Sequence, residues 1–134
     1  MEHYTIARVA EQSADFRRVL WTGTYVQLVI MTIPVGGEIG EEVHEDTDQI
    51  LTFVSGTGEA IISGKSRQVA AGDLVAVPAG LTHNFVNTVE NPLILYTVYG
   101  PPHHAADAVH ATTEEADAKE EAGEDEPPAD SAGA

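Results

Sequence analysis

The sequence predicts an all-β domain, built as an antiparallel sandwich or barrel. Short runs rich in β-branched and other apolar residues recur along roughly the first hundred positions. Turn-forming Gly, Pro, Asn and Asp residues separate these runs at short intervals. A Pro-x-Gly turn at 78–80 joins two of the runs directly. Many short strands with closely spaced turn signals are typical of packed antiparallel sheets, and 134 residues suffice for one hydrophobic core.

The first third of the chain contains two predicted strands. Residues 4–9 are expected to form a short edge strand. Residues 16–20 precede a turn-like segment at 21–24, and the apolar run 25–33 predicts a long strand. That strand ends at 34–37, because its Pro and two Gly residues interrupt a regular ladder.

The middle of the chain contains the remaining predicted strands. A strand begins at 42–44, a bend follows at 46–48, and 49–54 forms the next strand before the Gly-rich segment 55–58. The four residues Ser63-Gly64-Lys65-Ser66 indicate a hairpin between two strands. The strands after residue 56 are predicted at 59–62, 67–69, 73–77, 83–87 and 93–98.

These elements divide the chain into four segments. Residues 1–20 are an N-terminal strand and lead-in, 21–100 the β-barrel, 101–110 a post-barrel segment and 111–134 an acidic tail. The tail carries nine acidic residues and one lysine, and its largest apolar side chain is alanine. We expect this short tail to be disordered, because it cannot bury enough apolar surface to fold alone. A helix that is polar all round, over 112–122, is the alternative.

Composition excludes several classes of function. The net charge of −16 disfavours nucleic acid and anionic membrane surfaces, since both attract basic patches. The absence of cysteine excludes disulfides, thiolate metal sites and cysteine nucleophiles. No apolar run is long enough to cross a bilayer, and the first residues lack a basic region followed by an apolar one. We therefore expect a cytoplasmic protein with no nucleic-acid or membrane partner.

The most informative motif is G-x5-P-x-G-x2-H-x3-N. Its fixed positions are Gly72, Pro78, Gly80, His83 and Asn87. A buried strand runs into the Pro-x-Gly turn, which starts a second strand with a histidine near its beginning. A rigid turn that directs one imidazole toward a barrel interior is a suitable way to hold a metal ligand. Asn87 is expected to make structural hydrogen bonds.

This motif resembles the second signature motif of the cupin superfamily at every fixed position. The first cupin motif, G-x5-H-x-H-x3,4-E-x6-G, aligns upstream with Gly36 and Gly56 as its flanking glycines. Its three ligand positions then fall on Glu42, His44 and Gln49, so Glu replaces the first His and Gln replaces the usual Glu. The resemblance covers about residues 20–100 and implies a double-stranded β-helix, or jelly roll.

The same resemblance implies a metal site formed by Glu42, His44, Gln49 and His83. Glu42 and His44 are two residues apart and share one face of a strand, whereas Gln49 faces inward only if the bend at 46–48 changes the register. Two imidazoles, one carboxylate and one amide oxygen suit a divalent first-row transition metal such as Mn, Fe, Zn, Cu or Ni. The alternative is a metal-free, hydrogen-bonded polar core.

Other side chains are weaker candidates. Gln27 interrupts an apolar run and is a candidate pocket residue, together with Phe53, Trp21 and Tyr96; core packing is the alternative for each. The histidines outside the motifs are expected to be surface residues, and a second metal site among those near the tail is the less favoured interpretation: His3, His103, His104 and His110.

Three functions are compatible with this sequence. The first is a metal-dependent isomerase acting on a sugar-like hydroxy-carbonyl compound. The second is a metal-dependent dioxygenase, and the third is a protein that binds a metal or small ligand without catalysis. The Arg17-Arg18 pair is the one basic pair that could contact a substrate phosphate, and surface cations on an acidic protein are the favoured alternative for it. As for many small cupins, a homodimer is expected.

Overall fold

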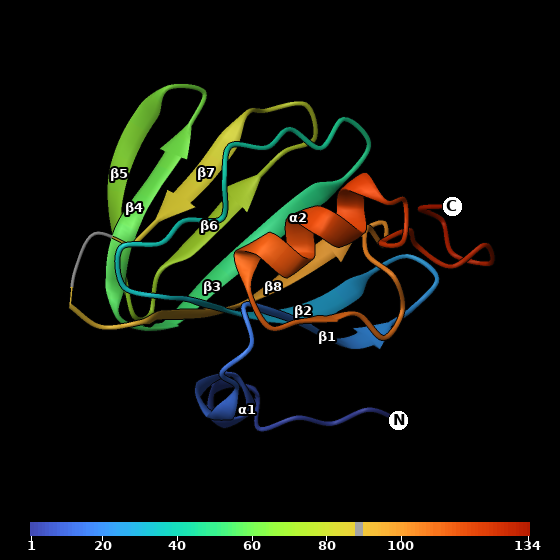
Figure 1. The fold of residues 1–134 in the computed structure, drawn as a ribbon, viewed down its shortest axis with the longest axis horizontal. Helices are drawn as coiled ribbons and strands as arrows, with labels where there is room; N and C mark the ends of the chain where they lie inside the picture. Colours follow the sequence, from blue (N-terminus) through green and yellow to red (C-terminus); the bar gives the residue numbers. More distant parts are fainter. Residues whose placement is uncertain (88–89) are drawn as a thin grey trace.

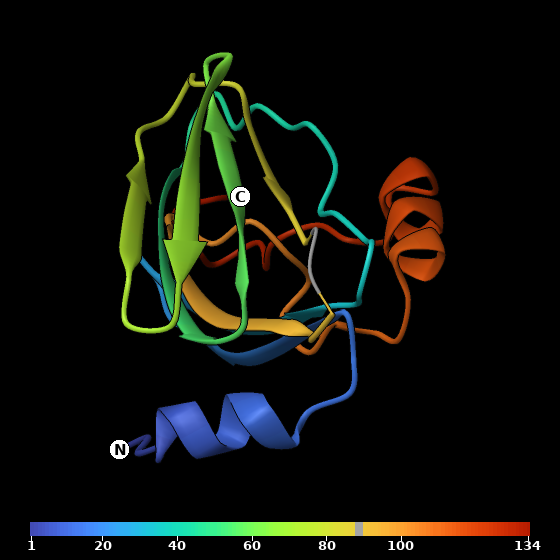
Figure 2. The same cartoon turned by 90° about the vertical axis from the view of Figure 1, so that its left-hand side faces the viewer.

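The computed structural model describes residues 1–87 and 90–134, which form two antiparallel sheets facing each other (Figures 1 and 2). One sheet has the strand order β6-β3-β8-β2-β1-β9, and the other has the order β5-β4-β7. The strands are β1 (Arg17–Thr22), β2 (Gln27–Ile33), β3 (Asp48–Ser55), β4 (Thr57–Ile62), β5 (Lys65–Ala70), β6 (Leu74–Val77), β7 (His83–Val86), β8 (Leu93–Gly100) and β9 (Val109–His110). This arrangement confirms the predicted jelly roll.

The position of each strand follows from its pattern of side chains. β8 alternates strictly between buried and partly exposed residues, as expected for a strand with one face on the core. β2 is apolar along nearly its whole length and lies inside the larger sheet, between β1 and β8. The two sheets bury Phe53 and Phe85 between them, with ring centroids 5.8 Å apart.

Two glycines of the motifs are required by backbone geometry. Gly80 has a φ of +86° in the turn before β7, a conformation that other residues rarely adopt. Gly56 has a φ of +87°, and an added Cβ would lie 2.4 Å from the Pro92 carbonyl oxygen. The glycines therefore fix the path of the chain into and out of the strands that carry the site.

The N-terminal prediction is wrong, because residues 6–12 form helix α1 (Ile6–Gln12) where the sequence predicted an edge strand. Ile6, Val9 and Ala10 recur with helical spacing, and Ala10 is buried. The helix packs against β8, β3 and β2, on the outer side of the sheet (Figure 2). The larger sheet also begins at Arg17, four residues before the predicted start of the barrel.

The acidic tail contains a helix over 113–121, which corresponds to the alternative predicted over 112–122. Helix α2 (Thr113–Glu121) begins after Thr112, whose side chain accepts a hydrogen bond from the Glu115 amide. Ala116 is buried, and further along the Ala132 amide donates to the Thr24 carbonyl at 2.7 Å. Small side chains and polar contacts to the barrel thus hold a segment that has no large apolar residue.

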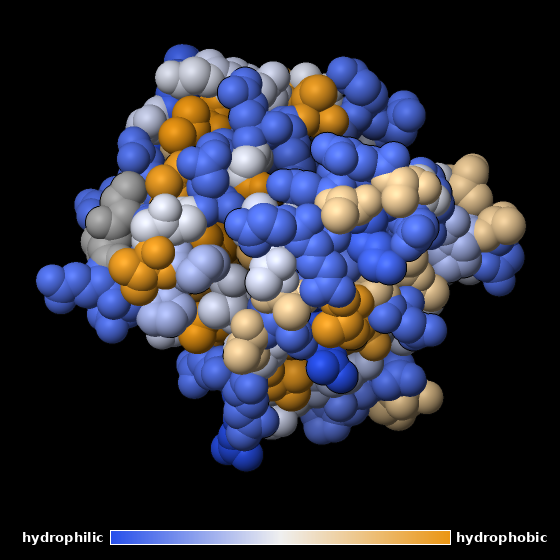
Figure 3. All heavy atoms as spheres, in the orientation of Figure 1, coloured by the Kyte–Doolittle hydropathy of each residue, from blue (hydrophilic) through white to orange (hydrophobic). Residues whose placement is uncertain are grey.

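The surface around α2 is mostly hydrophilic (Figure 3). Over residues 1–87 and 90–134, no helix is long and apolar enough to cross a membrane.

Candidate metal centre

The two sequence motifs meet through their backbones at Glu42 and His83. The Glu42 amide donates to the His83 carbonyl and the His83 amide donates to the Glu42 carbonyl, each at 2.8 Å. This antiparallel pair places the two side chains next to each other. Glu42 is held by this isolated bridge, outside the named strands, whereas His83 is the first residue of β7.

His44 completes a compact group with Glu42 and His83. The Gly80 amide donates to the His44 carbonyl at 2.8 Å, so the Pro-x-Gly turn holds both motifs together. His44 Nε2 lies 3.0 Å from a Glu42 carboxylate oxygen, and the rings of His44 and His83 are 5.0 Å apart between centroids. One candidate ligand atom from each residue lies within 4.8 Å of the others, so this group could hold a metal ion.

The charge state of the group suits a cation. Burial alone would raise the pKa of Glu42, but the hydrogen bond with His44 and the positive charge of Arg17 hold it below its usual value. Burial lowers the pKa of His83, whose Nδ1 lies 3.0 Å from the Leu81 carbonyl oxygen. If Nδ1 donates there, the lone pair of Nε2 is left for a metal.

Gln49 is the remaining predicted ligand, and it is buried. Its Nε2 donates to the Thr97 hydroxyl at 3.0 Å, and that hydroxyl donates to the Ile50 carbonyl at 2.9 Å. Its Oε1 is buried and has no hydrogen-bond partner among the described residues. A buried acceptor without a donor is costly, and a metal ion would satisfy it. The donor set therefore fits a divalent metal, and ligation by Gln49 stays a prediction.

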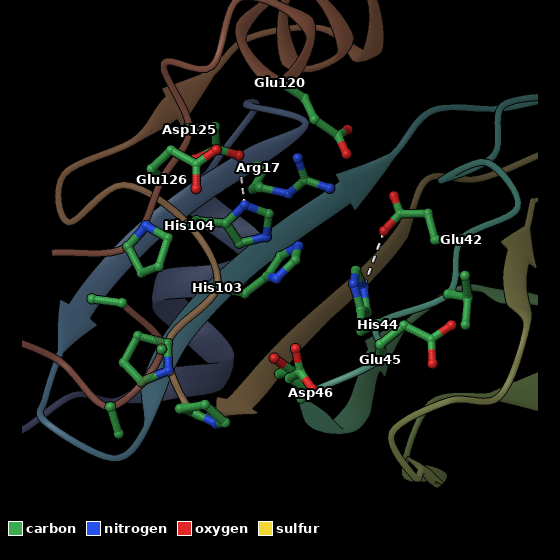
Figure 4. A pocket seen from close by; sticks show the side chains of 18 residues that line it. Arg17, Glu42, His44, Glu45, Asp46, His103, His104, Glu120, Asp125 and Glu126 are labelled. Atoms are coloured by element: carbon green, nitrogen blue, oxygen red, sulfur yellow. Dashed lines mark hydrogen bonds and ion pairs between the residues drawn. The ribbon is translucent and has the colours of Figure 1, made fainter. Parts of the chain in front are cut away.

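A pocket of about 470 Å³ lies against Glu42 and His44 (Figure 4). In Figure 4, the Arg17 guanidinium points toward Glu42, and the His103 ring lies beside that of His44. The tail closes part of the pocket, because its lining includes Glu120 of α2, Asp125–Pro127 and Ala132–Ala134.

Comparison with known proteins agrees with this geometry. Residues 29–99 match the Cupin_2 family, the cupin domain. The chain is a cupin. It is 39% identical over 123 residues to the uncharacterized protein YrkC of Bacillus subtilis, covering 87% of this chain and 66% of the relative. It is 33% identical over 94 residues to the uncharacterized protein L612 of Acanthamoeba polyphaga mimivirus, covering 66% of this chain and 58% of that relative.

The fold also matches a solved structure. BH2720 from Bacillus halodurans has a TM-score of 0.86 and 35% identity, covering 87% of this chain and 93% of that chain. The chain spans just under two thirds of the length of YrkC, and less of L612, so it corresponds to only part of these curated relatives.

The four predicted pocket residues do not line the cupin pocket. Gln27 projects inward, but its side chain is fully used in hydrogen bonds to the backbone of His103 and His104 and to the Thr22 hydroxyl. Phe53 belongs to the hydrophobic core.

The other two predicted pocket residues lie elsewhere. Tyr96 alternates with the buried residues of β8 and therefore faces the outer side of the sheet. Trp21 is 41% exposed and lines a separate hollow with Met1, Glu2, Tyr4 and Leu28. Alternation along β8 could have excluded Tyr96 and selected Tyr99, which is buried and lies 6.0 Å from His44 between ring centroids.

The expectation that His103 and His104 form a surface pair is wrong. The His103 ring lies 4.2 Å from His44 and 5.6 Å from Tyr99 between centroids. His104 is buried, and its Nδ1 lies 2.6 Å from a carboxylate oxygen of Asp125. His110 is also buried, although it too was predicted at the surface. The chain turns back after β8, and this turn brings the histidines inward.

Burial sets the protonation of these side chains. Burial, with the neighbouring imidazoles of His104 and His44, lowers the pKa of His103 to about 3. Burial also lowers the pKa of His104, although the hydrogen bond to Asp125 acts in the opposite direction. For Asp125, burial opposes ionisation, but the bond from His104 and that from the Ala105 amide lower the pKa to about 2. His103 and His104 are therefore neutral near pH 7.

The metal-free protein is expected to lose stability between pH 6 and pH 5. In the unfolded chain, His103 and His104 take up protons near pH 6.5, whereas in the folded protein their pKa values are lower. Their contribution to stability is complete above about pH 6.5 and falls as the pH drops toward the folded pKa. Between pH 6 and pH 5, His103 alone should lower the free energy of unfolding by about 1 kcal/mol, and His104 changes it in the same direction. Urea unfolding with a chelator present measures the change.

A matched pair of variants assigns this pH dependence. His103→Gln should reduce the change in the free energy of unfolding between pH 6 and pH 5. His3→Gln, at an exposed position, should leave that change as in the wild type. Equal slopes in all three proteins would contradict the assignment to the buried histidines.

Proposed function

We propose that this cupin is a metal-dependent enzyme acting on a small oxygenated organic molecule. Glu42, His44 and His83 would hold one divalent first-row metal, and Gln49 would add a weak oxygen donor. The observation that carries the proposal is the convergence of a carboxylate and two imidazoles within 4.8 Å beside a polar pocket. Such a bound metal polarises carbonyl and hydroxyl oxygens of a substrate.

Isomerisation of a hydroxy-carbonyl compound is the reaction that the surrounding residues favour. This reaction needs a group that takes a proton from one carbon and returns it to the next. His103 is placed for this role, because its ring lies 4.2 Å from that of His44 between centroids. Tyr99 can hold a neutral hydroxyl nearby, because burial raises its pKa well above the ordinary value.

A dioxygenase is the second candidate, and the ligand set itself favours it. Two histidines and one carboxylate form the set that is typical of non-haem iron oxygenases with open coordination positions. This reaction does not require the proton-transfer group at His103. The two candidates therefore predict different dependence on oxygen and on His103. Homodimer formation stays a prediction for either candidate.

The first experiment is elemental analysis of protein purified without a histidine tag. We expect about one metal per chain in the wild type, and loss of that metal in Glu42→Ala and His44→Ala. A wild type that contains no metal and binds none on reconstitution would contradict the proposal and favour a hydrogen-bonded polar core.

The second experiment separates the two reactions. The metal-loaded protein is incubated in D2O, without oxygen, with a panel of hydroxy-aldehydes and hydroxy-ketones, and NMR follows deuterium incorporation. Incorporation that is lost in His103→Gln supports the isomerase. Oxygen consumption by the iron-loaded protein, unchanged in His103→Gln, supports the dioxygenase. Metal binding without either reaction would identify a non-catalytic binding protein.

A further inference from the structure

Arg17 is a buried cation that faces the pocket. It alternates with Arg18 along β1, so Arg17 points inward at 6% exposure and Arg18 points to solvent. Arg18 lies 3.7 Å from an Asp15 carboxylate oxygen, an ordinary surface ion pair. Arg17 lines the same pocket as Glu42 and His44.

The structure gives the Arg17 guanidinium no hydrogen bond or ion pair with any residue in 1–87 or 90–134. Its Nε is buried without a partner. The central carbon of the guanidinium, Cζ, lies 5.2 Å from the ring centroid of Phe16. The buried Nε–H is one of the five N–H donors of the planar guanidinium, and leaving this donor unpaired is costly. A buried N–H donor without a partner, on a cation beside a pocket, therefore indicates a ligand that accepts a hydrogen bond from it.

Two of the nearby carboxylates, Asp125 and Glu42, have other partners. Both carboxylate oxygens of Asp125 accept hydrogen bonds, one at the His104 ring and the other from the Ala105 amide. An oxygen of Glu42 contacts His44. Glu120 also lines the pocket, but no ion pair joins it to Arg17. These acids make the electrostatic potential around Arg17 more negative, but none of them accepts a hydrogen bond from its guanidinium.

We infer that Arg17 binds a carboxylate group of the substrate, while a second oxygen of the same molecule reaches the Glu42, His44 and His83 centre. The inference rests on the proposed function and names its substrate class: small organic acids with a neighbouring hydroxyl or carbonyl oxygen. Two parallel N–H groups on one edge of a guanidinium match the two oxygens of a carboxylate.

The charge of the pocket favours a carboxylate over a phosphate. Arg17 is the one arginine or lysine among the residues that line this pocket, within the part of the chain that the structure describes. Acidic side chains outnumber it: Glu42, Glu45, Asp46, Glu120, Asp125 and Glu126. A single guanidinium can balance a singly charged carboxylate, whereas a doubly charged phosphate would remain partly unbalanced beside these acids.

Calorimetric titration of the zinc-loaded protein tests the inference. The probes are 2-hydroxy and 2-oxo acids of two to six carbons, their neutral primary amides, and methyl phosphate. We expect at least one acid to bind, with its amide at least tenfold weaker. Arg17→Met should weaken that acid at least tenfold and leave zinc stoichiometry at the wild-type value. Arg18→Met, a matched loss of the adjacent arginine, should bind the acid like the wild type.

Arg17→Lys keeps the charge but not the planar fork, so it should bind the acid more weakly than the wild type. If Arg17→Met does not fold, the acid is titrated into Arg17→Lys instead. The inference is overturned if no acid binds, if acid and amide bind equally, if methyl phosphate binds more tightly than every acid, or if both Arg17 variants bind the acid like the wild type. Failure of the proposed function is distinct, because the wild type would then bind no zinc.

Discussion

His83→Ala is expected to lower metal affinity at least tenfold, and up to about a hundredfold. His83 is buried, and its backbone is fixed by two hydrogen bonds to Glu42. The contact of Nδ1 with the Leu81 carbonyl orients the ring. Alanine removes one of three converging donors, and no other histidine starts from the same turn. Competition with a chromogenic chelator measures the affinity for zinc, manganese and iron.

The control for this prediction is His3→Ala, which removes an exposed histidine far from the motifs in sequence. It should bind metal like the wild type. If His83→Ala retained the stoichiometry and affinity of the wild type, His83 would not be a ligand, and the two motifs would meet for structural reasons only.

Gln27→Met is expected to destabilise the protein by about 3 kcal/mol or more. The fully buried Gln27 makes four hydrogen bonds: its Oε1 accepts from the His103 and His104 amides, and its Nε2 donates to the His104 carbonyl and the Thr22 hydroxyl. Methionine has a similar volume but leaves these backbone groups without partners, each at a cost of about 1–3 kcal/mol. Urea unfolding at pH 7.5 measures the loss.

The same variant should also disturb the pocket, because Gln27 holds the segment that carries His103. We expect metal binding to persist, since none of the described hydrogen bonds of Gln27 goes to Glu42, His44 or His83. The activity that depends on His103 should fall. Gln68→Met is the matched control at an exposed position of β5 and should change stability by less than about 0.5 kcal/mol. Equal stability of Gln27→Met and the wild type would contradict the anchoring role.

The strands were largely predictable because their signals are local. The hairpin at 57–70 follows from Ser63 and Gly64, which both adopt positive φ in the turn. The apolar run of β2 and the alternation of β8 likewise determine which residues can be buried. The N-terminal helix was missed because Ile and Val at 6 and 9 suit either a strand or a helical face, and packing against the sheet decides between them.

The clustering of three of the four candidate ligands was predictable from the sequence. Fixed spacing in the two motifs selected Glu42, His44 and His83, and the backbone bridge between Glu42 and His83 gives the physical reason for that spacing. The pocket lining was not predictable in this way. Three of its lining residues are far apart in sequence: Arg17, His103 and Asp125. Side chains of these types are common on protein surfaces, so the sequence does not mark them as pocket residues.

The sequence by itself determined the strands, the tight turns and the two motifs, because these depend on alternation, on glycine conformation and on spacing over a few residues. The tertiary structure alone decided what faces the candidate metal centre. Gln27 accepts hydrogen bonds from the His103 and His104 amides, and Asp125 accepts from the Ala105 amide and contacts His104 Nδ1. These bonds hold the end of the chain over the barrel. These contacts join residues 20 or more positions apart, and their geometry exists only once the sheets have formed.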